Sequence, residues 1–64
     1  MLAEERFSKI LSIIESEGSA TMQELMTALD ASESTIRRDL NTMDENGLLT
    51  KVHGGAIAKK PSIN

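Results

Sequence analysis

The chain has no cysteine, tryptophan or tyrosine, and Phe7 is its only aromatic residue. Without cysteine no disulfide can form, and the single histidine, His53, offers none of the usual zinc-site spacings. We therefore predict no metal site and a reducing, cytoplasmic environment. No apolar run approaches the roughly 20 residues of a membrane span, and the N-terminus lacks a signal-peptide pattern, so no membrane association is expected.

The sequence also has little that could perform catalysis. No nucleophile is grouped with a base, and the run His53-Gly54-Gly55 is not accompanied by the Gly-x-Ser-x-Gly of a hydrolase with an oxyanion-hole loop. A turn is the favoured interpretation of that run. The chain is predicted not to be an enzyme, with no catalytic residues and no cofactor of its own.

What is present is one small domain with an uneven charge. A chain of 64 residues buries only about 60% of its unfolded surface, so its stability should be marginal. The formal net charge of −3 combines −5 for residues 1–33 with +2 for residues 34–64. This asymmetry suggests that one face contacts a polyanion, although five cations on a polar surface are also common.

Apolar spacing and capping residues predict three helices. Phe7, Ile10, Leu11 and Ile14 form one helical stripe and indicate a helix over residues 3–17. The next begins after a capping box of Thr21 and Glu24 and ends near Asp30. The third begins after Ser32 and ends at Asn46-Gly47. So tight a connection between the last two helices predicts a helix-turn-helix, although the usual glycine of its turn is missing.

A β-hairpin should follow the third helix. The short apolar runs 48–52 and 56–58 flank the His53-Gly54-Gly55 turn, and Ala20 with its neighbours is expected to add a third, minimal strand. The fold class is therefore mainly α with a small β-hairpin. The tail over residues 59–64 has no periodicity and reads as a linker.

The third helix should have a buried and an exposed face. Ile36, Leu40 and Met43 fall within one narrow arc, which is the predicted core stripe. The opposite side holds Ser34, Arg37, Arg38, Asn41 and Glu45. Arginine and asparagine donate to guanine and adenine edges, and phosphates would offset the repulsion between adjacent arginines. A merely solvated helix face is the alternative, which the tight turn before it and the basic hairpin after it disfavour.

Asp39 flanks the core arc rather than the exposed face. A partly shielded carboxylate there should have a cationic partner, and Arg6 on the first helix is the candidate. We therefore expect Asp39→Ala to lower stability more than Asp44→Ala.

Two stretches in the second half of the chain resemble a known family. Residues 32–40, with the run Thr-Ile-Arg-Arg-Asp-Leu, followed by Gly47-Leu48 and by Val-His-Gly-Gly-Ala at 52–56, closely resemble the N-terminal DNA-binding domain of DeoR-type bacterial transcription repressors. The resemblance extends from about Arg6 to Ala58. Lys51 stands where the family frequently has arginine. The lysine retains the positive charge but lacks the bidentate fork of a guanidinium.

The resemblance implies a winged helix-turn-helix over residues 1–58, with the third helix in the major groove, the hairpin as the wing, and an interdomain linker starting at residues 59–64. It further implies a repressor of sugar or related carbon metabolism genes. A larger C-terminal domain outside these residues would bind a phosphorylated sugar and form a homo-oligomer. The isolated domain should be monomeric or weakly associating and bind its double-stranded DNA operator weakly.

The candidate DNA-binding residues are Ser32, Ser34, Thr35, Arg37, Arg38, Asn41, Lys51, His53 and Gly54. For Lys51 and His53, contact with the DNA backbone and simple solvation remain open. A winged helix can also serve as a protein-interaction module, and that is the alternative function.

Overall fold

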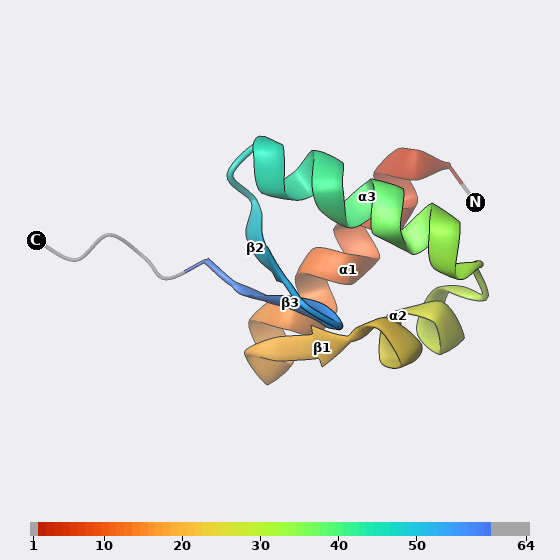
Figure 1. Cartoon of the computed structure of the whole chain (residues 1–64), viewed down its shortest axis with the longest axis horizontal. Coiled ribbons are helices and arrows are strands. Elements are labelled where there is room, and N and C mark those ends of the chain that lie inside the picture. Colours follow the sequence, from red (N-terminus) through yellow and green to blue (C-terminus); the bar gives the residue numbers. More distant parts are fainter. Residues whose placement is uncertain (1, 60–64) are drawn as a thin grey trace, which may run out of the picture.

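The computed structural model describes residues 2–59, which form helices and a small sheet around one core (Figure 1). In chain order the elements are α1 (Ala3–Glu17), β1 (Ser19–Thr21), α2 (Met22–Leu29), α3 (Glu33–Glu45), β2 (Leu49–Val52) and β3 (Gly55–Ala58). The predicted fold class, mainly α with a small hairpin in a winged helix-turn-helix, is confirmed. Of the predicted linker, residues 60–64 lie outside the described part of the chain.

The helices begin where the capping residues predict. Thr21 Oγ1 accepts from the backbone N–H of Glu24 at 3.0 Å, and the Glu24 carboxylate accepts from the N–H of Thr21 at 2.8 Å. Ser32 Oγ accepts from the N–H of Thr35 at 3.3 Å and so caps α3. Each side chain satisfies a backbone donor that has no partner inside the helix.

The connection between α2 and α3 explains how the turn forms without glycine. Asp30 has φ 51° and ψ 49°, the left-handed conformation that glycine adopts most easily. Aspartate is among the few other residues that tolerate it. The N–H groups of Asp30 and Ala31 both donate to the carbonyl of Met26, closing α2 before α3 starts.

The sheet has the order β1-β3-β2, with both pairs antiparallel. Ala20 in β1 lies opposite Ala56 in β3, which confirms the minimal third strand. The hairpin turn is shorter than predicted, because Val52 pairs with Gly55 and only His53 and Gly54 remain between the strands.

The two adjacent glycines of the hairpin have different physical roles. Gly54 has φ +83° in the turn, a conformation that side-chain-bearing residues rarely adopt. Gly55 belongs to β3, where a Cβ would lie 2.2 Å from the carbonyl oxygen of Ala20. Glycine is therefore required at position 55 by the close approach of β1, which the turn prediction did not anticipate.

A single core joins the three helices to the sheet. Its buried apolar residues are Ile10, Ile14, Ala20, Leu25, Leu29, Ile36, Leu40, Met43, Leu49 and Ala56. The predicted stripe of α3, Ile36, Leu40 and Met43, is fully buried. Packing against residues from α1, α2 and the sheet fixes which side of α3 faces outward.

Within residues 2–59, no helix combines the length and apolar character needed to cross a membrane.

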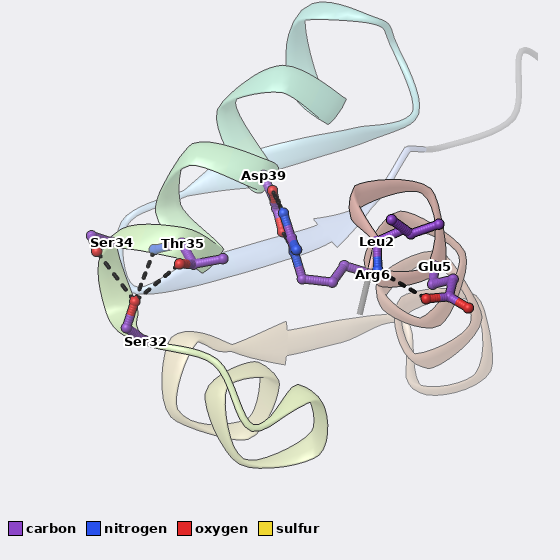
Figure 2. A network of polar contacts seen from close by, with 7 residues as sticks. All are labelled: Leu2, Glu5, Arg6, Ser32, Ser34, Thr35 and Asp39. Atoms are coloured by element: carbon purple, nitrogen blue, oxygen red, sulfur yellow. Dashed lines mark hydrogen bonds and ion pairs between the residues drawn. The ribbon is translucent and has the colours of Figure 1, made fainter.

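An ion pair holds α3 to α1, as predicted from the position of Asp39. Arg6 contacts Asp39 through two nitrogens: Nε donates to Oδ2, and Nη2 donates to Oδ1 at 3.1 Å (Figure 2). The Asp39 side chain is only 5% exposed. Hydrogen bonding to this carboxylate raises the pKa of Arg6 further above its ordinary value. The guanidinium therefore stays charged and satisfies the buried acid.

Candidate DNA-binding surface

The first turn of α3 carries a cluster of hydroxyl groups. The oxygen of Ser32 lies 3.2 Å from that of Ser34 and donates to that of Thr35 at 3.0 Å (Figure 2). Ser32 and Ser34 are exposed, whereas Thr35 is half-buried. Ser32 therefore caps α3 in the free domain by accepting from the N–H of Thr35, and all three hydroxyls lie at the N-terminal end of the helix, which favours anions.

The predicted outward face of α3 is confirmed. Arg37, Arg38 and Asn41 are exposed, on the side opposite the buried stripe. Arg38 and Asp39 are neighbours in sequence and lie on different faces, because successive helical residues are about 100° apart. The side chains that could donate to base edges are thus free of the core.

The two adjacent arginines have different surroundings. Arg37 Nη2 donates to Glu33 Oε2 at 2.6 Å, in an i,i+4 ion pair along the helix. Among residues 2–59, Arg38 has no hydrogen-bond or ion-pair partner. The sequence-based prediction does not distinguish the two arginines and does not include Glu33 in the site. The i,i+4 spacing between Glu33 and Arg37 is the sequence feature that could have indicated the ion pair.

The wing, residues 49–58, is tied to both α2 and α3. The backbone N–H of Lys51 donates to Asp44 Oδ2 at 2.8 Å, which joins β2 to the end of α3. The N–H of Met22 donates to the carbonyl of Gly54 at 2.8 Å, which fixes the turn against the start of α2. Figure 1 shows the hairpin turn at this end of α2. The wing therefore has a defined position relative to α3.

A hollow of about 300 Å³ lies between the first turns of α3 and the wing. Its lining residues are Met22, Glu33, Arg37, Lys51, Val52, His53 and Gly54. The structure thus brings together four of the predicted site residues, Arg37 with the three of the wing. His53 and Gly54 are exposed, and Lys51 is half-buried.

The other predicted residues do not line this hollow. Arg38 and Asn41 lie further along the exposed face of α3, and the three hydroxyl residues belong to its N-terminal turn. The candidate surface is therefore a helix face bordered by a wing, with both basic and hydrogen-bonding side chains. Such a surface can donate to phosphates and to base edges at once.

Comparison with known proteins agrees with this geometry. Residues 6–62 match the model of the DeoR-like helix-turn-helix domain. Over 56 residues the chain is 52% identical to an uncharacterized HTH-type transcriptional regulator, FruR, of Bacillus subtilis (strain 168), covering 88% of the chain and 22% of FruR.

Two further relatives are named as repressors. The chain is 44% identical over 59 residues to the lactose phosphotransferase system repressor of Lactococcus lactis subsp. lactis, covering 88% of the chain and 23% of the repressor. It is 42% identical over 59 residues to the glycerol-3-phosphate regulon repressor of Haemophilus influenzae (strain ATCC 51907 / DSM 11121 / KW20 / Rd). That match covers 92% of the chain and 23% of the repressor. No solved structure shows a significant match.

The chain thus spans less than a quarter of the length of these three relatives. The matched region contains every helix and strand of the described structure except the first residues of α1. The chain belongs to the DeoR-like helix-turn-helix domain family.

Proposed function

We propose that this chain is the DNA-reading domain of a bacterial transcriptional repressor and binds a double-stranded operator. In this proposal α3 enters the major groove and the wing approaches the neighbouring backbone. The observation that carries the proposal is the exposed face of α3, where Arg37, Arg38 and Asn41 project beside the wing. Their donors suit guanine, adenine and phosphate.

The regulated genes are proposed from the names of the relatives. Two of the proteins to which the chain is similar are named for a lactose phosphotransferase system and a glycerol-3-phosphate regulon. We therefore assign this domain to a repressor of sugar or related carbon metabolism, acting in the cytoplasm. The effector would be a phosphorylated sugar bound by a part of the full-length protein beyond these residues, which would also form the homo-oligomer.

The test is selection of randomised duplexes by the 64-residue chain, followed by affinity measurements as a function of salt. A domain that neutralises roughly four phosphates gives a slope of log K against log salt near −4. Alanine at Arg37 or Arg38 should weaken binding strongly. No enrichment of any duplex would contradict the proposal. Binding to a protein partner that is insensitive to salt and to both substitutions would favour an interaction module instead.

A further inference from the structure

Glu33 places a negative charge on the surface proposed to contact DNA. It is the first residue of α3 and lines the hollow between this helix and the wing. Its side chain is 57% exposed, and that of its partner Arg37 is 54% exposed. A carboxylate in this position opposes the approach of phosphates, so its presence requires an explanation.

Folding stability is a weak explanation for the Glu33–Arg37 pair. An exposed i,i+4 ion pair contributes little, because water and salt screen it and two long side chains must be ordered. The position at the start of α3 does favour an acid, since the helix dipole is positive there. This dipole effect would leave DNA discrimination unchanged, which distinguishes it experimentally from a role in recognition.

The pair instead gives Arg37 a defined orientation. Helical side chains lean toward the N-terminus, and the bond to Glu33 holds the guanidinium over the first turn of α3. The N-terminal residues of a recognition helix are those that contact base edges. A guanidinium has five N–H donors, and the bond to Glu33 uses one nitrogen, so donors remain for the O6 and N7 of a guanine.

Arg38 lacks this restraint. It is exposed, and within the described residues no acceptor holds its side chain. An unrestrained arginine can follow backbone phosphates, whose recognition needs charge more than a fixed fork. The adjacent arginines therefore differ in the property that separates base recognition from phosphate binding, which is preorganisation.

We propose that Glu33 is a specificity-determining residue that positions Arg37 for bidentate donation to a guanine, while Arg38 binds backbone phosphate. The inference rests on the proposed operator binding. Glu33 acts through Arg37 and is a positioning residue. It lowers the affinity for DNA in general and raises the preference for one sequence.

The first experiment compares Glu33→Gln with Glu45→Gln in the 64-residue chain. Glu45 is an exposed acid on the same helix that contacts no arginine, so it matches the change in charge. Probes are the duplex enriched from the randomised pool and a shuffled duplex of equal composition. Glu33→Gln should raise affinity for the shuffled duplex and reduce the ratio of the two affinities on the order of tenfold. Glu45→Gln should leave the ratio unchanged.

The second experiment asks whether Glu33 acts through Arg37. In an Arg37→Ala background, Glu33→Gln should no longer alter the ratio. Arg37→Lys should retain the salt slope and lose discrimination, because lysine keeps the charge without the fork. Arg38→Lys should keep the ratio of the two affinities, because any change in its phosphate contact affects both duplexes alike.

Two results would overturn the inference. One is an unchanged ratio for Glu33→Gln, which would then act as a simple change of surface charge. The other is an equal loss of discrimination with and without Arg37. In either case the wild-type chain still prefers the enriched duplex. A wild-type chain without any preference would instead remove the proposed function itself. Circular dichroism melts of each variant confirm that the helices compared are folded.

Discussion

The two faces of α3 carry opposite chemistry over the same two turns of helix. The inner face contributes Ile36, Leu40 and Met43 to the core, with Asp39 buried against Arg6. The outer face leaves its arginines and Asn41 in solvent. The Arg-Arg-Asp run is therefore not a single charged patch. Its third residue fixes the helix to the domain so that the first two can face a ligand.

Removing an apolar group from the inner face should have the largest effect. Leu40 is fully buried, so Leu40→Ala should reduce the free energy of unfolding by about 3 kcal/mol, close to the entire stability of so small a domain. Its neighbour Asn41 is exposed, and Asn41→Ala should change stability by less than about 0.5 kcal/mol. Urea titration followed by circular dichroism measures both. Similar losses for the two would contradict the division into faces.

Substitution of the buried acid Asp39 should cause the second-largest loss of stability. Asp39→Ala removes the acceptor of two hydrogen bonds in a nearly buried site and should reduce the free energy of unfolding by about 2 kcal/mol.

Two exposed acids on α3 provide graded controls for Asp39. Asp44→Ala should have a smaller effect of about 1 kcal/mol, because Asp44 accepts from the backbone of Lys51 at the surface. Glu45→Ala should have almost no effect, since this side chain is exposed and does not hold the wing through a hydrogen bond to the described residues. The same urea midpoints test the order, and equal effects at Asp39 and Asp44 would argue against the buried ion pair.

A substitution on the outer face should separate binding from folding. Arg38→Ala should leave the urea midpoint unchanged, since the side chain is exposed and unpaired within the described residues. It should lower affinity for enriched and shuffled duplexes alike on the order of tenfold and reduce the salt slope by about 1. Fluorescence anisotropy at several salt concentrations measures this. A loss confined to the enriched duplex would place base recognition at Arg38 instead.

A substitution in the turn before α3 should stabilise the domain, by less than the losses expected at Leu40 and Asp39. Asp30 combines a left-handed backbone with a negative charge at the negative end of the dipole of α2. Asp30→Gly should raise the free energy of unfolding by about 0.5–1 kcal/mol, because it removes both penalties while adding the entropy of glycine. Asp30→Asn removes only the charge and should give a smaller gain, and urea titration measures both changes. A loss with glycine would show that the aspartate side chain stabilises the turn.

Much of this architecture follows from local patterns. The capping box at Thr21 and Glu24, the cap at Ser32 and the stripe of α3 depend on residues within a few positions of one another, and each was predicted. The Arg6–Asp39 pair spans a longer distance in sequence, yet it was predicted because an acid beside a core stripe requires a cation.

Other features depend on contacts between distant segments. Gly55 is required by the carbonyl of Ala20, and the position of the wing depends on the bond between Met22 and Gly54. Neither partner can be identified from the sequence around the hairpin. The hollow that joins Arg37 to the wing is equally a product of packing.

Local sequence is enough to specify the helices, their caps and the outward direction of the arginines, because helical periodicity and capping act over a turn or two. Which of the two arginines is held, and which residues lie beside it, becomes clear from the folded chain. That difference arises because side-chain contacts and the placement of the wing against α3 depend on how the whole chain packs.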